Sequence, residues 1–366
     1  MQGKKKAIGN IVFLLAVFVL TVYGIFHGED MGAMVQAVKK ADVRWLVPGV
    51  FLVLFFIWGE SVILWYMMRS FRIYIRKRIC FLFSSAGFFF SCITPSASGG
   101  QPMQVYYMNK EKIPVPVATV ILMIVTITYK LVLVVTGLGV VLFGQGFQHR
   151  YLGGILPVFY LGVLLNVFCV SFMTVLVFHP VLAENILSKG MDWLERLHIM
   201  KRAKTRRKKL SQSMQSYRET AAYLKEHKKV IAWVILITFI QRFALFAVTW
   251  MVYRAFGLSG TAAADVVLLQ AVISVSVDML PLPGGMGISE SLFLKIFAPV
   301  FASLTLPAMV LSRGLGYYSQ LAISAVFTIV AQVYYTLRDA RHREGIQRIE
   351  QAEKPGSMPQ AAGKSA

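Results

Sequence analysis

Charged residues stand within or beside long apolar runs of this sequence, where an isolated charge is costly. They are Glu60, Lys130, Arg242, Asp278, Glu290, Lys295 and Arg313. An ionisable residue inside a membrane-spanning segment is a functional candidate by default. Arginine suits bidentate phosphate recognition, lysine acts as a point charge, and the acids could meet an amine. These side chains could therefore line a cavity for a group bearing phosphate and amine; alternatively, they pair with each other and hold the bundle together.

Two breaks rich in proline and glycine interrupt the apolar runs. Their residues are Pro95, Gly99, Gly100, Pro281, Pro283, Gly284, Gly285 and Gly287. Glycine lets the backbone approach a ligand closely, and a half-helix that begins after Gly287 would present unpaired N–H groups to an anion. The alternative is a tight turn between two helices. A phosphate-binding P-loop is excluded, because the second break lacks the GK[ST] ending and a preceding strand.

The elements that must position these residues follow from composition. Of the 366 residues, 57% are hydrophobic and 15% are charged, and the net charge is +21. A soluble domain is about 45–50% apolar and about 25% charged, so a soluble enzyme of one or two domains is excluded. The many aromatic residues exclude a disordered chain. The composition predicts an all-α polytopic membrane protein.

Apolar length and the distribution of Lys and Arg predict the topology. The full spans expected are 8–26, 45–68, 114–143, 151–178, 230–256 and 305–335. Basic residues collect at the N-terminus, in 69–78, in 189–229 and after 335, so both termini are predicted to be cytoplasmic. The chain must then enter the membrane and return to the side from which it came over 79–108, and it must do so again over 262–304. We expect each of these two segments to be a re-entrant hairpin with a Pro/Gly-rich tip.

These spans divide the chain into segments. Residues 1–178 form an N-terminal membrane half with the first hairpin, and 179–229 form a basic cytoplasmic linker with an amphipathic helix. Residues 230–337 form a C-terminal membrane half with the second hairpin, and 338–366 form a disordered cytoplasmic tail. The two halves run in opposite directions, which predicts an inverted repeat, an architecture of many secondary transporters.

The sequence contains no motif typical of a soluble enzyme. The cysteines and histidines lack metal-ligand spacing, and no Ser/His/Asp or Cys/His arrangement is present, so we expect no metal, no cofactor and no catalytic residue. The basic run 201–209 is typical of a segment that sets topology and attracts anionic lipid. Without a folded binding module beside it, nucleic acid is not an expected partner.

The second break has the form of a known signature. Residues 281–290 resemble the P-x-PGG-x-G-x-x-E motif of the lysylphosphatidylglycerol synthase transmembrane-region family. Residues 94–100 resemble the upstream P…GG element of that family, and 311–313 with Tyr317 resemble its late arginine segment. The resemblance extends from about residue 8 to 338. The family often has an acid directly after the first Gly-Gly and a basic residue three positions later, whereas this chain has Gln101 and Gln104.

The resemblance implies a bacterial cell-membrane domain similar to the flippase half of the multiple peptide resistance factor. Its expected function is translocation of lysylphosphatidylglycerol or another anionic or aminoacylated phospholipid, linked to lipid metabolism and cationic peptide resistance. Full-length members also carry a cytosolic domain that attaches lysine from lysyl-tRNA to phosphatidylglycerol, and we expect no such domain here. The implied partners are anionic phospholipid, a separate synthase or soluble transferase, and a second copy of this chain. Two other functions stay open: a phosphatidylglycerol lysyltransferase and a non-catalytic membrane scaffold.

Overall fold

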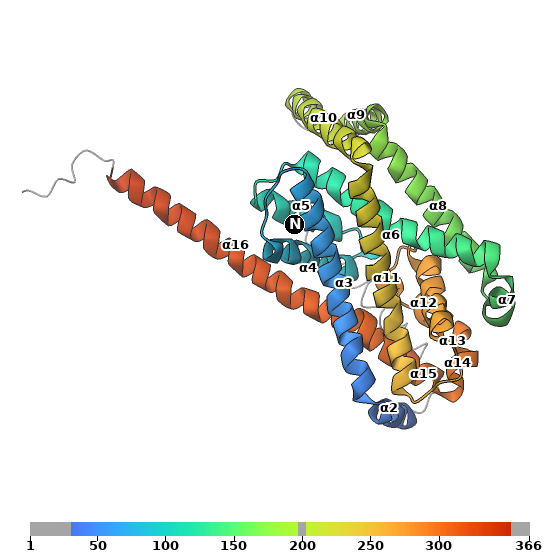
Figure 1. Cartoon of the computed structure of the whole chain (residues 1–366). Coiled ribbons are helices and arrows are strands. Elements are labelled where there is room, and N and C mark those ends of the chain that lie inside the picture. The colour runs from blue at the N-terminus through green and yellow to red at the C-terminus, as the bar shows by residue number, and fades with distance from the viewer. Residues whose placement is uncertain (1–30, 197–202, 353–366) are drawn as a thin grey trace, which may run out of the picture.

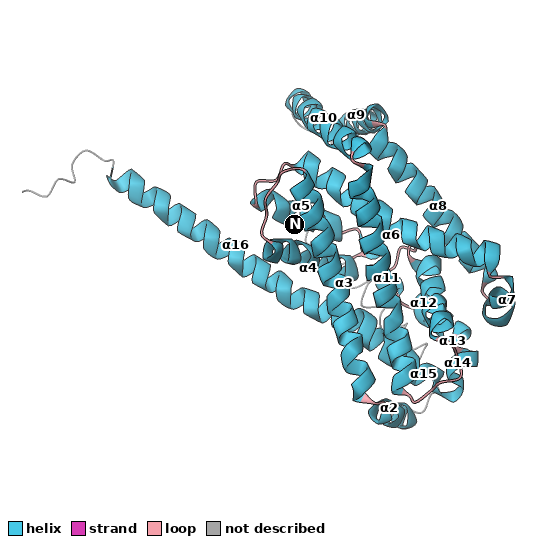
Figure 2. Cartoon of the chain, in the orientation of Figure 1, coloured by secondary structure: helices cyan, strands magenta, loops and turns pink. Residues whose placement is uncertain are grey.

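The computed structural model describes residues 31–196 and 203–352, and this part of the chain is helical without strands (Figures 1 and 2). The N-terminal half contains α2 (Met31–Lys40), α3 (Val43–Ser70), α4 (Lys77–Ile93), η1 (Pro95–Ala97), α5 (Gly100–Lys110), α6 (Val115–Phe143), α7 (Gln145–Phe147), η2 (Gln148–Leu152) and α8 (Leu156–Phe178). Two helices follow, α9 (Pro180–Arg196) and α10 (Ala203–Glu226). The C-terminal half contains α11 (Lys228–Ala255), α12 (Ala263–Val277), η3 (Pro283–Gly285), α13 (Ile288–Ile296), α14 (Ala298–Phe301), η4 (Ala302–Leu304), α15 (Thr305–Arg313), η5 (Gly314–Tyr318) and α16 (Ser319–Ala352).

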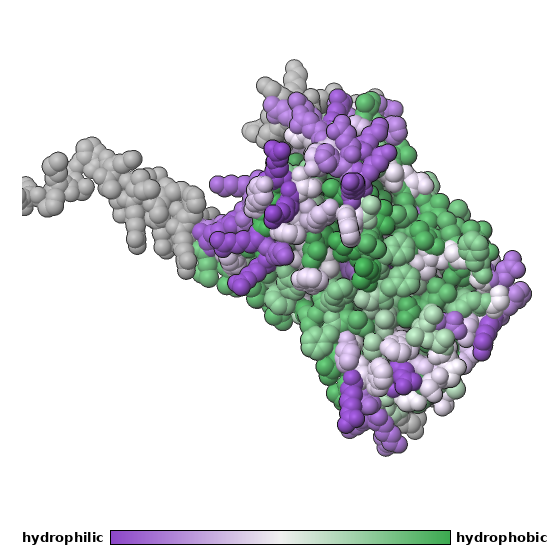
Figure 3. All heavy atoms as spheres, viewed as in Figure 1, coloured by the Kyte–Doolittle hydropathy of each residue, from purple (hydrophilic) through white to green (hydrophobic). Residues whose placement is uncertain are grey.

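Five stretches of helix within the described residues are long and apolar enough to cross a membrane. They are α3, α6, α8, α11 and the run 288–340, which extends from α13 into α16. Four of them, α3, α6, α8 and α11, match predicted spans. The run 288–340 contains the predicted span 305–335 but begins inside the predicted second hairpin, and the first predicted span, 8–26, lies outside the described residues. Figure 3 shows a broad apolar band between polar surfaces at the two ends of the molecule. Such a band is what lipid tails require of a multi-pass membrane protein.

Each Pro/Gly break joins two shorter helices that pack on one another. We call α4, η1 and α5 the first hairpin, and α12, η3 and α13 the second hairpin. Figure 1 places α5 toward the end of the molecule that carries α9 and α10, and α13 toward the end that carries α2. The turns η1 and η3 contact each other, so the tips of the two hairpins meet inside the bundle.

Glycine is needed at both tips for different reasons. A Cβ on Gly100 would lie 2.7 Å from the carbonyl oxygen of Gly87, so the first hairpin closes only without a side chain there. In the second hairpin Gly284, Gly285 and Gly287 have φ of 57°, 65° and 85°. This left-handed region is open to glycine at little steric cost. The tips are therefore determined by glycine backbone geometry.

The helix expected in the basic linker is present as α10, but protein covers its apolar face. Met214, Tyr217, Ala221 and Leu224 are buried, and α10 packs against α6, α8, α9 and α11. The Tyr217 hydroxyl donates to the carbonyl oxygen of Leu176 at 3.1 Å, and burial raises the pKa of this phenol. The apolar stripe of this amphipathic helix therefore contributes to the core of the bundle.

The structure also differs from the sequence-based expectation at the C-terminal end. Helix α16 continues to Ala352 and leads away from the body (Figure 1), so residues 338–352 are helical where a disordered tail was expected. The reason is that Arg, Glu, Gln and Ala, all good helix formers, dominate this stretch. Residues 353–366 lie outside the described residues.

A close crossing of α8 and α12 yields a first prediction. A Cβ on Gly162 would lie 2.5 Å from the carbonyl oxygen of Val275 and 2.7 Å from the Cα of Ser276, and neither backbone atom can move aside cheaply. We expect Gly162→Ala to lower the free energy of unfolding by about 1–3 kcal/mol, the usual cost of overpacking. Unfolding in detergent measures the effect. Gly139→Ala in α6 is the matched control, because no atom lies within 4 Å of its added methyl group, and equal stability of the two variants would contradict the prediction.

Candidate functional site

A cavity of about 530 Å³ lies where the two hairpins meet the long helices. Both halves of the chain contribute to its wall, including α3, the first hairpin and α6 from one half and α11, the second hairpin, α15 and η5 from the other. The predicted residues that line it are Glu60, Lys130, Arg242, Asp278, Gly284, Gly285 and Arg313. The fold therefore brings together charges that lie more than 250 residues apart in the sequence.

Lys130 and Asp278 neutralise one another across the cavity wall. The Lys130 Nζ lies 2.5 Å from the Asp278 Oδ2, and each side chain is 14% exposed. The same ammonium lies 3.1 Å from the sulfur of Met279. This pair links α6 to the end of α12, and its charges are already satisfied.

Arg313 and Glu290 form a second buried pair. The Arg313 Nη2 lies 2.7 Å from the Glu290 Oε1 and donates at 3.1 Å to the carbonyl oxygen of Gly284. The other carboxylate oxygen of Glu290 accepts from the backbone N–H of Gly287 at 2.7 Å and from the Ser289 hydroxyl at 3.1 Å. The sequence predicted that the start of this half-helix would be open to an anion. The carboxylate of Glu290 already caps the Gly287 N–H, so a side chain of this chain occupies part of the helix start that the sequence predicted to be open.

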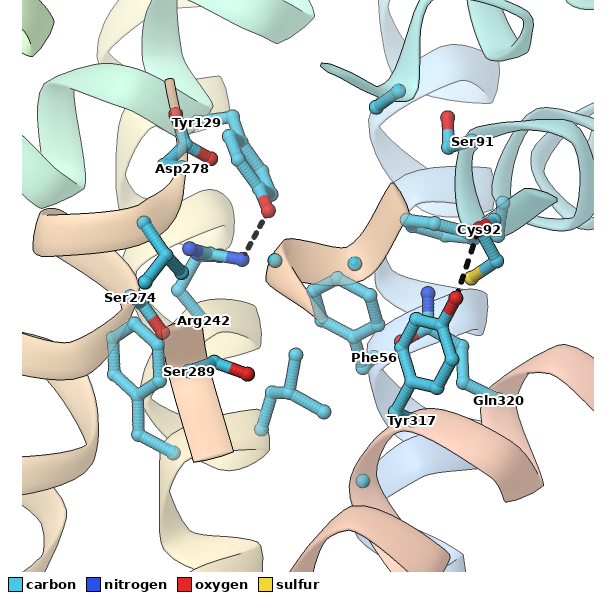
Figure 4. A pocket seen from close by; sticks show the side chains of 18 of the residues that line it. Phe56, Ser91, Cys92, Tyr129, Arg242, Ser274, Asp278, Ser289, Tyr317 and Gln320 are labelled. Carbon is cyan, nitrogen blue, oxygen red and sulfur yellow. Dashed lines mark hydrogen bonds between the residues drawn. The ribbon is translucent and has the colours of Figure 1, made fainter. Parts of the chain in front are cut away.

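Arg242 is buried, at 3% exposed, and has no carboxylate partner within the described residues. Its Nη1 donates to the Tyr129 hydroxyl at 2.5 Å (Figure 4), and its guanidinium carbon lies 3.8 Å from the centre of the Tyr129 ring. The Phe246 ring centre lies 5.0 Å away. The Nε atom is buried without a hydrogen-bond acceptor. Aromatic rings thus hold the guanidinium in place, and no carboxylate of the described residues neutralises its charge.

Glu60 is the acidic counterpart of Arg242. It is 8% exposed, accepts a hydrogen bond from the Gln104 Nε2 at 2.6 Å, and pairs with no cation in the described part of the chain. A tight crossing of α3 and α11 sets both groups on the wall of one cavity. A Cβ on Gly59 would lie 3.0 Å from the Gln241 side chain, and Gln241 donates to the carbonyl oxygen of Phe56 at 2.8 Å. Glu60 directly follows Gly59 on α3, and Arg242 directly follows Gln241 on α11, so this crossing positions both charged residues.

The remaining predicted residues lie outside the cavity wall or serve the turns. Lys295 is exposed on α13 and does not line the cavity. Pro95, Gly99, Gly100, Pro281 and Gly287 belong to the turns and are not lining residues, and Pro283 begins η3. Lys295 therefore does not join the other charges, because α13 turns it away from the centre of the bundle.

Several polar residues of the cavity were not predicted from the sequence. They include Gln104, which binds Glu60, and Tyr129, which binds Arg242. The hydroxyl of Thr249 lies 2.7 Å from that of Ser312 and donates to Gln270 at 2.9 Å, which links three elements of the C-terminal half. The sequence signal that could have identified these residues is a neutral polar side chain within a long apolar run.

Five apolar stretches of spanning length around a buried, charged cavity define a multi-pass helical membrane protein with an internal polar site. Residues 7–324 match the family described as the lysylphosphatidylglycerol synthase TM region, and the chain belongs to this family. Membership confirms the resemblance seen in the motifs and suggests a bacterial membrane protein of lysylphosphatidylglycerol-related lipid handling. A comparison with curated proteins finds no match.

Proposed function

We propose that this protein translocates the headgroup of an aminoacylated phospholipid, such as lysylphosphatidylglycerol, from one leaflet of the membrane to the other. The observation that carries the proposal is the pair of unneutralised groups on one cavity wall, Arg242 and Glu60. A buried charge without a partner is costly, so its retention points to a partner that arrives with the ligand. Outward display of such a lipid would make the membrane surface less anionic and contribute to cationic peptide resistance.

The two free charges fit the two charged parts of such a headgroup. Arginine forms bidentate, charge-assisted hydrogen bonds with phosphate, so Arg242 is assigned to the phosphodiester. Glu60 is assigned to the amine of the aminoacyl group. The volume of about 530 Å³ lies within the usual range of about 300–1,000 Å³ for small-ligand sites, and this suits a headgroup whose acyl chains stay in lipid.

The arrangement of helices supports an inverted repeat around this site. We match α3, the first hairpin and α6 with α11, the second hairpin and α15–α16. The partners correspond: α3 packs on α4 as α11 packs on α12, and α4 contacts α16 as α12 contacts α6. In this proposal both hairpins are re-entrant from opposite faces, both termini are cytoplasmic, and alternating access follows from motion of one repeat against the other.

Leaflet-specific labelling of reconstituted vesicles tests the function. A membrane-impermeant amine reagent reacts only with outer-leaflet lysylphosphatidylglycerol in protein-free vesicles, and we expect this protein to bring the inner pool into reaction as well. Glu60→Gln keeps the hydrogen-bonding shape but removes the charge that meets the amine. We expect it to slow translocation of the aminoacylated lipid about tenfold and to spare phosphatidylglycerol, which has no amine, if that lipid is also moved.

Three outcomes distinguish translocation from the alternative functions. Labelling that stops at the outer leaflet would exclude translocation by this chain alone. Appearance of lysylphosphatidylglycerol in a host that lacks it, on expression of this chain, would instead indicate a lysyltransferase. A scaffold would change neither the lipid content nor its distribution between leaflets.

A further inference from the structure

The tips of the two hairpins are joined by one residue of the C-terminal span. The Tyr317 hydroxyl donates to the carbonyl oxygen of Cys92 at 2.8 Å, at the end of α4 in the first hairpin (Figure 4). Its ring lies against Gly284 in the second hairpin, where an added Cβ would come within 2.3 Å of the Tyr317 Cε2. Tyr317 therefore contacts both tips at once, although it belongs to neither hairpin.

Arg313 reinforces this contact from one turn earlier. Its guanidinium carbon lies 4.7 Å from the centre of the Tyr317 ring, and its Nη2 donates to the carbonyl oxygen of Gly284. Cys92, Gly284, Arg313 and Tyr317 all line the cavity. Separation of this contact would consequently open the cavity at the place where the tips meet.

The backbone that carries Tyr317 is not an ordinary α-helix. Residues 314–318 form a single π-helical turn, η5, between α15 and α16. Such turns are rare and frequently mark functional sites. The turn contacts α3 and α11, the helices that carry Glu60 and Arg242.

Two glycines in this turn have no steric reason to be glycine. No atom lies within 4 Å of a Cβ placed on Gly314 or on Gly316, and neither residue has a positive φ. Glycine in a helix interior costs stability relative to alanine without giving close packing here. What it does provide is backbone freedom at the junction of α15 and α16.

We propose that Tyr317 is a positioning residue that ties the two hairpin tips together, and that the glycine-containing turn 314–318 is the hinge on which this tie is released. In the closed state Tyr317 seals the cavity between the tips. Bending at the hinge moves Tyr317 away from Cys92 and Gly284 and opens the cavity on that side. The role of this opening in headgroup passage rests on the proposed function, whereas the opening itself does not.

Cys92 is a native reporter of the opening, because it is 7% exposed and its neighbour in the cavity wall is Tyr317. In a chain carrying Cys80→Ala and Cys169→Ala, the rate of reaction of Cys92 with N-ethylmaleimide measures how often the tips separate. Tyr317→Phe keeps the ring and removes the hydrogen bond, and we expect it to raise this rate about fivefold. Gly314→Ala with Gly316→Ala restricts the hinge, and we expect it to lower the rate by a similar factor.

Matched controls separate a hinge from general loosening. Tyr318→Phe alters an exposed neighbour, and Gly139→Ala adds a methyl group to open space in α6; neither should change the rate. In a chain that keeps only Cys80, which is fully buried on the same helix as Cys92, Tyr317→Phe should leave labelling unchanged. Faster labelling of Cys80 would show general unfolding and overturn the inference, as would an unchanged rate at Cys92 in both the Tyr317 and the glycine variants. Because these measurements involve no lipid, they stand or fall separately from the vesicle assay.

Discussion

Arg242→Gln is expected to lower headgroup translocation about a hundredfold and to leave the protein folded and at least as stable. Two charge-assisted hydrogen bonds to a phosphodiester are together worth about 3 kcal/mol or more, which corresponds to about a hundredfold. The stability should not fall, because removal of a buried charge that no carboxylate in the described part of the chain neutralises offsets the lost contacts with Tyr129 and Phe246. Loss of flux without loss of stability is what distinguishes a ligand-binding charge from a structural one.

Arg254 provides the control for this prediction. It lies on the same helix, donates to the carbonyl oxygen of Leu258 at 3.1 Å, stacks on Trp45 and does not line the cavity. Arg254→Gln should therefore leave translocation in vesicles unchanged. Arg242→Lys keeps a charge but loses the planar fork, and we expect intermediate flux. Wild-type flux in Arg242→Gln would remove Arg242 from the site.

The spans could be predicted from the sequence because apolar length is a local property. Four of the predicted spans match single helices of the structure, within a few residues at each end for α3, α6 and α11, and the predicted span 305–335 is divided among α15, η5 and α16. The hairpins were harder, since the apolar run 79–94 is short and the run 262–280 leads directly into a Pro/Gly-rich segment. Their prediction depended on the distribution of Lys and Arg and on the Pro/Gly tips, and the structure has paired helices broken at those tips.

The pairing of charges could not be predicted. Lys130 and Asp278 are 148 residues apart, and no local pattern indicates that they meet. From the sequence all the charged residues formed one set of candidates. The described part of the chain instead has two neutral pairs, an exposed Lys295, and Glu60 and Arg242 without an ion-pair partner. In the proposed function only Glu60 and Arg242 depend on a ligand for neutralisation, and this distinction rests on the tertiary arrangement.

Amphipathic patterns were ambiguous for a related reason. Helix α10 has the spacing of a membrane-surface helix, but an apolar stripe is equally satisfied by lipid and by protein. The position of α6 and α8 beside it makes protein the partner. Gln104 is a further example: its type suggested only a missing charge, and the structure shows that it donates to Glu60.

Substitutions in the Arg313–Glu290 pair, unlike those at Arg242, should lower the stability of the protein. Its side chains are 20% and 8% exposed, and removal of one partner leaves a buried charge uncompensated. We expect Arg313→Gln to lower the free energy of unfolding by about 3 kcal/mol, the lower end of the cost of breaking a buried ion pair. Glu290→Gln should also be costly, because its carboxylate holds the Gly287 N–H at the start of α13.

A double-mutant cycle in detergent measures the coupling between these two residues. The double variant Glu290→Gln with Arg313→Gln should be less destabilised than the sum of the single variants, because neither charge is then left alone. The Lys110–Asp339 pair is the control: its side chains are 31% and 40% exposed, and its coupling should stay below about 1 kcal/mol. Additive effects at Arg313 and Glu290 would mean that the pair is not a unit. Arg313 would then have to be considered, with Arg242, as a charge available to the lipid phosphate.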